Sequence, residues 1–377
     1  DALTDADLNV AVGKGALTTD TLGSNSVAIG FAALEAQNFT TATDSYNTAV
    51  GSAAGAAVTT GVRNTFIGGL SGDALTTGQD NVAMGKSALS AETSGARSVA
   101  IGSNSLTAQN VGSGTAVYNT AVGYDAGASV TTGIKNILIG GLAGDAITDA
   151  DSNVAIGFES LTTNVLGSKS VAVGQGSLSN QNPATAADMY NVGVGYNAGS
   201  NITTGVLNTI VGSLAGDALA DADYNTAFGK SALSADTLGS RSTAIGTFAL
   251  EAQNFTTATD TYNTAVGYSA GDHITTGANN TIVGAQAGDA LTDADYNVAL
   301  GTSALSADTL GSRSTALGTS ALAAQNFTTA TNSDNTAVGA FTGDAITTGI
   351  DNTLIGAFAG SALTDADHNV AIGRAAL

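Results

Sequence analysis

Residues 263–271 read NTAVGYSAG, and close variants of this stretch recur as NTAVGYDAG at 119–127 and NVGVGYNAG at 191–199. Each variant places a short apolar triplet between an asparagine and a glycine. Such a triplet, rich in β-branched residues and bounded by turn-forming residues, predicts a short strand. The glycine that closes the motif is called the repeat glycine below.

The repeat glycines divide the whole chain into 21 short units. Their spacings are 17, 21, 17 and 17 residues, repeated without interruption, so four units form a block of 72 residues. A fixed short period is the signature of a stacked repeat architecture. We therefore predict one all-β domain over residues 1–377, a parallel β-roll or β-solenoid of 21 coils. At a strand spacing of about 4.8 Å, 20 steps would span roughly 96 Å.

A polar residue stands four positions before every repeat glycine. It is asparagine except in the second unit of each block, where serine replaces it: Ser26, Ser98, Ser170, Ser242 and Ser314. Stacked asparagines form hydrogen-bonded ladders in β-structures, so we expect a ladder here. The repeat glycine allows a sharp turn or a close backbone approach.

The predicted strands are apolar on both faces. In the triplet Val298, Ala299, Leu300, alternate side chains point to opposite sides of the strand. The coil interior covers only one face, so a second copy of the chain is the simplest cover for the other. In every fourth unit a large residue replaces the alanine, which we interpret as a plug in the seam between copies: Phe66, Leu138, Ile210, Ile282 and Leu354.

Composition excludes several classes of partner. The 31 acidic residues outnumber the 10 basic ones, for a net charge of −21. Nucleic acids and anionic membrane surfaces bind through lysine and arginine, so neither is expected as a partner. No apolar run approaches the roughly 18 residues of a membrane span, which argues against insertion of this segment. Cysteine is absent, so disulfides and thiolate metal sites are excluded.

Catalytic motifs are also missing, and we predict that the chain is not an enzyme. The glycine spacing around Gly193 and Gly195 does not match the dinucleotide-binding fingerprint. His273 and His368 occupy non-equivalent positions, and neither has a suitably spaced nucleophile. The glycine-rich stretches are therefore interpreted as structural.

Clusters of aspartates form a candidate calcium site, because hard cations prefer several carboxylate oxygens on a turning loop. Aspartate is also an ordinary turn residue, so solvated turns are the alternative. No cofactor other than calcium is expected. The candidate metal ligands recur in three blocks: Asp145, Asp149 and Asp151; Asp217, Asp221 and Asp223; Asp289, Asp293 and Asp295.

The 21-residue units carry longer loops, which are candidate ligand-binding elements because loops on rigid scaffolds often serve recognition. The alternative is that their aromatic side chains fold back against the roll. Two neighbouring pairs, Asp236 with Arg241 and Asp308 with Arg313, are expected to clip these loops. The candidate ligand-binding residues are Phe39, Tyr46, Phe255, Tyr262 and Phe327.

Residues 24–30, Ser-Asn-Ser-Val-Ala-Ile-Gly, resemble the head repeats of trimeric autotransporter adhesins, the family of the Yersinia adhesin head. The NTAVG form is also similar to repeat arrays of phage and bacterial tail-fibre-domain proteins. The resemblance implies a left-handed, homotrimeric β-roll in an extracellular filament, on a bacterial cell surface or a virion tail fibre. It also implies attachment to a host-cell or surface receptor, either a glycan or a protein. The 17-residue period is longer than the family's usual one.

Residues 1–7 share the register of residues 361–367, and neither end carries an atypical capping unit. Solenoids normally need such caps, so we expect this array to be a window of a longer fibre. An alternative function is that of a monomeric solenoid that binds ice through threonines. The pairs Thr203–Thr204, Thr275–Thr276 and Thr347–Thr348 motivate it.

Overall fold

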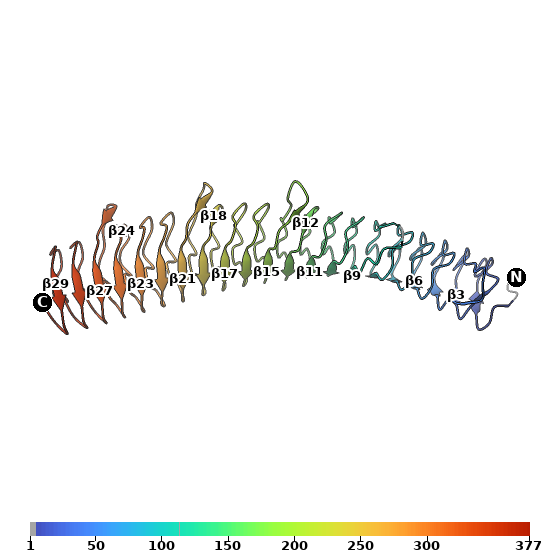
Figure 1. The fold of residues 1–377 in the computed structure, drawn as a ribbon, viewed down its shortest axis with the longest axis horizontal. Helices are drawn as coiled ribbons and strands as arrows, with labels where there is room; N and C mark the ends of the chain where they lie inside the picture. The colour runs from blue at the N-terminus through green and yellow to red at the C-terminus, as the bar shows by residue number, and fades with distance from the viewer. Residues whose placement is uncertain (1–4, 113) are drawn as a thin grey trace. The chain divides into compact units, whose positions relative to one another are not determined.

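The computed structural model describes residues 5–112 and 114–377 and is an all-β parallel β-solenoid of about 21 coils (Figure 1). These described residues contain no helix. The match between residues 1–4 and the end of the array lies outside the described residues. Contacts divide the chain into two compact units, Asp1–Tyr190 and Asn191–Leu377, which are described separately.

Each coil contributes one three-residue strand that pairs in parallel with the strand of the neighbouring coil in its unit, residue for residue. The prediction of short parallel strands is confirmed. The first unit contains β1 (Val10–Val12), β3 (Val27–Ile29), β5 (Thr48–Val50), β6 (Thr65–Ile67), β7 (Val82–Met84), β8 (Val99–Ile101), β9 (Thr120–Val122), β10 (Ile137–Ile139), β11 (Val154–Ile156) and β13 (Val171–Val173).

The second unit repeats the arrangement of the first. Its strands are β15 (Val192–Val194), β16 (Thr209–Val211), β17 (Thr226–Phe228), β19 (Thr243–Ile245), β21 (Thr264–Val266), β22 (Thr281–Val283), β23 (Val298–Leu300), β25 (Thr315–Leu317), β27 (Thr336–Val338), β28 (Thr353–Ile355) and β29 (Val370–Ile372).

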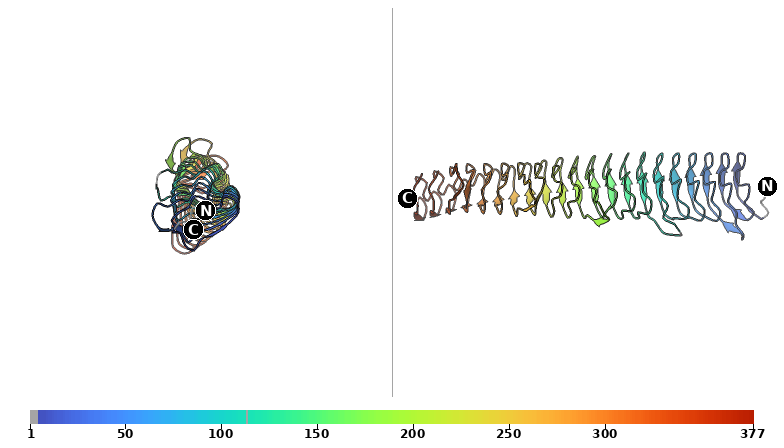
Figure 2. Two further views of the ribbon diagram at one scale, coloured as in Figure 1. Left: turned by 90° about the vertical axis from the view of Figure 1, so that its right-hand side faces the viewer. Right: turned by 90° about the horizontal axis from the view of Figure 1, so that it is seen from above.

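The 21-residue coils add short two-residue strand pairs at the base of their longer loops. Figures 1 and 2 show several of these loops reaching beyond the neighbouring 17-residue coils. The pairs are β2 (Gly23–Ser24) with β4 (Thr43–Asp44), β12 (Gly167–Ser168) with β14 (Ala187–Asp188), β18 (Gly239–Ser240) with β20 (Thr259–Asp260), and β24 (Gly311–Ser312) with β26 (Thr331–Asn332).

A buried asparagine ladder joins successive coils, as predicted. The Asn263 Oδ1 accepts the backbone N–H of Asn280 at 2.9 Å, and the Asn263 Nδ2 donates to the Gly277 carbonyl at 2.7 Å. Asn280 makes the same two bonds to Asn297 and Ala294. Each side chain thus satisfies two backbone groups of the next coil that would otherwise be buried without partners. The ladder therefore sets both the spacing and the register of the coils.

The serine that replaces the ladder asparagine in the second coil of each block is too short to reach the next coil. A buried glutamine makes a hydrogen bond to the next ladder asparagine instead. Gln253 lies eleven residues after Ser242 and donates from Nε2 to the Ser242 hydroxyl at 2.9 Å. Its Oε1 accepts from the Nδ2 of Asn263 at 2.9 Å. Gln37 and Gln325 make the same contact with Asn47 and Asn335. A glutamine seven positions after the repeat glycine therefore supplies the polar group that the serine lacks.

The interior is filled by different side chains in different coils of a block. This corrects the interpretation that the large strand residues plug a seam between copies. The middle residue of nearly every strand points into its own coil and is buried, including Phe66, Ile210 and Ile282. Where that residue is alanine, the interior is filled by a leucine four positions after the repeat glycine in the first two coils of a block, as with Leu233 and Leu250, and by a valine or isoleucine seven positions after it in the third, as with Ile274. Where it is large, glycines face it: a Cβ on Gly72 would lie 2.3 Å from the Phe66 ring. The large residues therefore plug the roll itself.

The same strand orientation turns the first and third residues of each triplet outward.

The interior of a coil lies between its strand and its loop. A Cβ built on Gly288 would meet Ile282 at 3.0 Å and Leu291 at 2.9 Å. In the fourth coil of a block, the inner residue of the strand and the apolar residue seven positions after the repeat glycine therefore both pack against this glycine. Each coil thus has a strand wall and, on the other side of this interior, a loop wall.

Repeat glycines cannot carry a side chain. Gly267 has a φ of 141°, and a Cβ there would lie 2.5 Å from the carbonyl oxygen of Gly284 in the next coil. The residue just before each ladder position is also left-handed, with φ between 46° and 65° throughout the array. None of these residues is glycine, although this conformation costs roughly 1–2 kcal/mol for an L-amino acid.

We predict that Asn280→Ala lowers the free energy of unfolding by about 2–4 kcal/mol, because it leaves two buried backbone groups unpaired at about 1–3 kcal/mol each. Chemical denaturation of both proteins measures the difference. The matched control is Asn254→Ala, which removes an exposed asparagine from a loop. Equal losses in the two variants would contradict the role of the ladder.

Candidate functional site

The outward residues of the strands form an exposed surface of apolar residues and threonines, here called the strand face. It consists of the first and third residues of each three-residue strand. In β17, β19 and β23 the side chains of Phe228, Ile245 and Leu300 are 56%, 38% and 41% exposed. Monomeric proteins rarely expose apolar patches larger than a few hundred Å². A face built this way in coil after coil is a candidate interaction surface.

The leading edge borders the strand face on one side and consists of the left-handed residue five positions before each repeat glycine. Its side chains are strongly biased toward cationic and aromatic types. It contains six of the ten lysines and arginines (Arg63, Arg97, Lys135, Lys169, Arg241 and Arg313) and six of the nine tyrosines (Tyr46, Tyr118, Tyr190, Tyr224, Tyr262 and Tyr296).

The trailing edge borders the strand face on the other side and consists of the residue directly after each repeat glycine. It contains the remaining four cations, Lys14, Lys86, Lys230 and Arg374, and the remaining three tyrosines, Tyr124, Tyr196 and Tyr268.

Charge is therefore partitioned around the coil. The two edges hold all ten cations and three acids, Asp80, Asp334 and Asp351, for a net charge of 10 − 3 = +7. The remaining 31 − 3 = 28 acidic residues occupy other repeat positions, which hold no lysine or arginine. Tyrosine and arginine are enriched at protein interfaces, while aspartate and glutamate are depleted. The two edges match this composition in their tyrosines and arginines, although they also hold all five lysines of the chain, a residue type depleted at interfaces.

Neighbouring coils join these side chains into clusters. The Arg241 guanidinium lies 5.0 Å from the ring centre of Tyr224 and 5.9 Å from that of Tyr262, within cation–π range. It also pairs with Asp260 at 2.9 Å, rather than with the expected Asp236. In the preceding block the Lys169 Nζ lies 2.6 Å from Asp188 Oδ2 and 3.1 Å from the Tyr190 hydroxyl. The interaction with Lys169 lowers the pKa of Asp188.

The five predicted ligand-binding aromatics divide into two groups. Phe39, Phe255 and Phe327 are at most 7% exposed, so they fold back against the roll and present little surface to a ligand. Tyr46 and Tyr262 are 56% and 53% exposed and belong to the leading edge. The alternation of tyrosine with cations along that edge was the sequence signal that could have identified the larger surface.

The predicted calcium ligands bond to neighbouring coils. Asp293 Oδ1 accepts from the Thr276 hydroxyl at 2.6 Å, and Asp295 Oδ1 accepts from the Ala278 N–H at 2.7 Å. The same contacts join Asp221 to Thr204, Asp223 to Val206, Asp149 to Thr132 and Asp151 to Ile134, and Asp145 accepts from Thr162.

The first aspartates of the other two clusters differ from Asp145. Asp217 and Asp289 each keep one buried carboxylate oxygen without a hydrogen-bond partner, and burial raises the pKa of both. Over residues 5–112 and 114–377, no three His, Cys, Asp or Glu side chains are grouped to hold a metal ion. This arrangement gives the calcium hypothesis no support. It makes the aspartates register elements of the loop wall.

Asp236 is fully buried beneath the long loop of its block. Its Oδ1 accepts from the N–H groups of Gly239 and Phe255 at 3.0 Å, and its Oδ2 accepts from Gln253 Nε2. Burial raises the pKa of Asp236 even though these donors favour the charged form. Asp308 makes equivalent contacts, and Asn164 holds this position in the third block. The expected clips to Arg241 and Arg313 are therefore replaced by an internal network.

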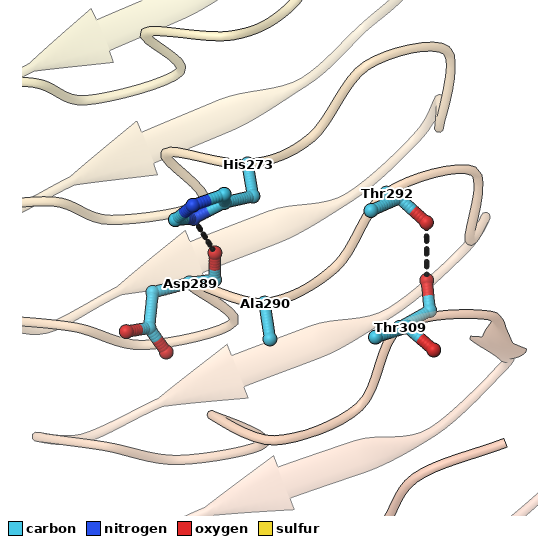
Figure 3. Close-up of a pocket in the computed structure, with 5 residues that line it drawn as sticks. All are labelled: His273, Asp289, Ala290, Thr292 and Thr309. Atoms are coloured by element: carbon cyan, nitrogen blue, oxygen red, sulfur yellow. Dashed lines mark hydrogen bonds between the residues drawn. The ribbon is translucent and has the colours of Figure 1, made fainter. Parts of the chain in front are cut away.

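A surface hollow of about 310 Å³ lies on the loop wall and is lined by His273, Asp289, Ala290, Thr292 and Thr309. The His273 Nδ1 lies 2.8 Å from the Asp289 carbonyl oxygen, and the Asp289 carboxylate turns away from the ring (Figure 3). The Thr292 hydroxyl donates to the Thr309 carbonyl at 3.0 Å.

Partial burial lowers the pKa of His273, but the charge of Asp272 and the hydrogen bonds outweigh it and raise the pKa overall. The other blocks replace this histidine with Ala57, Ser129, Asn201 and Ala345. A feature of one coil in the array, with its threonine hydroxyl already engaged, offers no nucleophile for catalysis.

Comparison of the chain with protein-family models gave no match, and comparison with curated proteins gave none. Within the described residues, no helix has the length and apolar character needed to cross a membrane.

We predict that pH acts on stability through Asp236. Because its folded-state pKa is raised, the protonated carboxyl favours folding, and this contribution is lost as pH rises above the ordinary aspartate range near 4. Wild type should therefore lose stability relative to Asp236→Asn as pH rises, measured by denaturation across acidic to neutral pH. Asp188→Asn should show the opposite sign, because Lys169 lowers the Asp188 pKa. If the stability differences between wild type and each of the two variants changed in the same direction with pH, this assignment would be contradicted.

Proposed function

We propose that the chain is a structural and adhesive segment of an extracellular fibre, built from parallel copies of a left-handed β-roll in a homotrimer. Its action is mechanical reach combined with repeated contacts to a surface receptor, either a glycan or a protein. The fibre belongs to a bacterial cell surface or a phage tail. Length is then set by the number of 72-residue blocks, and weak repeated contacts gain avidity.

One observation carries the proposal: the exposed apolar strand face between two edges that hold every tyrosine, lysine and arginine of the chain. Burial of apolar surface contributes roughly 25 cal/mol per Å², so a face of this extent strongly favours association. The non-repeating hollow at His273 offers no comparable basis for a catalytic function.

We expect light scattering to give three times the chain mass of 36.6 kDa. Ile245→Asp with Leu300→Asp should reduce the mass toward one chain, because each variant places a charge on the strand face. Thr256→Asp with Thr257→Asp adds the same charge to an exposed loop and should leave the mass unchanged. Circular dichroism confirms that both variants keep the β-fold.

A wild-type mass of one chain would refute the assembly. If the oligomer mass falls toward that of one chain only when a calcium chelator is added, the calcium hypothesis for the Asp217, Asp221 and Asp223 cluster would be restored.

A second candidate, ice binding, is favoured by threonines in the first position of five consecutive strands: Thr209, Thr226, Thr243, Thr264 and Thr281. However, the third position of these strands carries Val, Ile or Phe, which interrupts a threonine grid. The hydroxyls of Thr204 and Thr276 already bond to aspartates. We therefore expect no thermal hysteresis from the purified chain, and clear activity would favour this candidate over the fibre.

A further inference from the structure

We propose that the leading edge of one copy meets the trailing edge of the next copy at the same coil, so that assembled chains lie parallel and in register. This inference rests on the self-assembly proposed above and names the residues that decide its geometry. It follows from what the two edges carry, coil by coil.

The strand face needs a cover that one chain does not provide. Within a coil, the leading-edge and trailing-edge residues are six positions apart and lie beyond opposite ends of a three-residue strand of roughly 10 Å, so the two edges are separate. When several copies turn their strand faces toward a common axis, the leading edge of each copy borders the trailing edge of its neighbour. Such a contact joins two different surfaces and closes a ring when the rotation closes.

Side-chain sizes on the two edges are complementary at the same coil. Where the leading edge carries a long cation, the trailing edge carries a short or uncharged residue. The pairs in the second and fourth coils of the blocks include Arg97 with Ser103, Lys169 with Gln175, Arg241 with Thr247, Arg313 with Thr319, Arg63 with Gly69 and Lys135 with Gly141.

The third coil of three blocks pairs tyrosine with tyrosine instead. The pairs are Tyr118 with Tyr124, Tyr190 with Tyr196 and Tyr262 with Tyr268. All six side chains are between 48% and 61% exposed in the single chain. Aromatic pairs add roughly 0.5–1.5 kcal/mol beyond area burial, so three pairs per contact would contribute both stability and specificity.

The charges on the two edges favour some alignments of neighbouring copies over others. At the same coil, no lysine or arginine faces another, and Lys86 faces Asp80. If each leading edge met the trailing edge one coil earlier, Arg97 would face Lys86 and Arg241 would face Lys230. One coil later, Arg63 would face Lys86, while Asp351 would face Arg374, so this register is disfavoured at one contact and favoured at another. Like charges brought together at an interface are unfavourable, so equal coils are preferred.

The absence of native cysteine allows a direct test with paired cysteines and a short thiol-to-thiol cross-linker. The variant Arg241→Cys with Thr247→Cys reports the equal-coil register. The variant Arg241→Cys with Tyr268→Cys reports the register shifted by one coil. Arg241→Cys alone controls for contact between two leading edges.

We expect covalent species of more than one chain mainly from the equal-coil pair, at least tenfold above the shifted pair and the single variant. A second equal-coil pair, Tyr262→Cys with Tyr268→Cys, should behave in the same way and covers the case in which the first pair disturbs folding. Stronger linking by the shifted pair or by the single variant would overturn the inference.

The oligomer mass of wild type and of each cysteine variant, measured by light scattering, distinguishes a failure of this inference from a failure of the proposed function. Oligomers that fail to cross-link at equal coils would refute the edge pairing while leaving the fibre intact. A wild-type chain that remains a monomer would refute both.

Discussion

The hydrogen bonds from buried asparagine side chains to the backbone of the next coil are the constraint on which this architecture depends. Each coil has only one strand of three residues, which by itself offers few ladder bonds. Asn280 adds two further bonds to the next coil at 2.8–2.9 Å. These bonds also hold in place the strained left-handed residue that precedes each asparagine. That residue projects outward, so the same ladder that stacks the coils also aligns the leading edge.

The interior and the exterior of the solenoid are specified by different positions and can vary independently. The interior is filled by pairing an alanine with a leucine, valine or isoleucine, or a large residue with glycine, as around Phe66 and Gly72. Overpacking or a void would each destabilise the roll, so these pairs are constrained. Residues on the two edges face no such restriction. They nevertheless hold every lysine, arginine and tyrosine of the chain.

The distribution of charge separates two tasks. Aspartates on the loop wall accept hydrogen bonds from threonines and N–H groups of the neighbouring coil, as Asp293 and Asp295 do. Cations lie only beside the strand face. In the proposed fibre, the excess negative charge of the loop wall would favour solubility. The strand wall, with its apolar residues and aromatic edges, would make the contacts between copies.

The sequence by itself determined the period, the short parallel strands and the asparagine ladder, because a fixed register repeats the same local chemistry in every coil. It did not determine which strand face points inward. Val298, Ala299 and Leu300 are all apolar, and only the volume of the folded coil selects alanine for the interior. The fate of Phe255 and Asp236 was likewise decided by tertiary structure, because each depends on contacts that the chain path brings together. The edges became visible only when the fold aligned residues from separate coils beside one face.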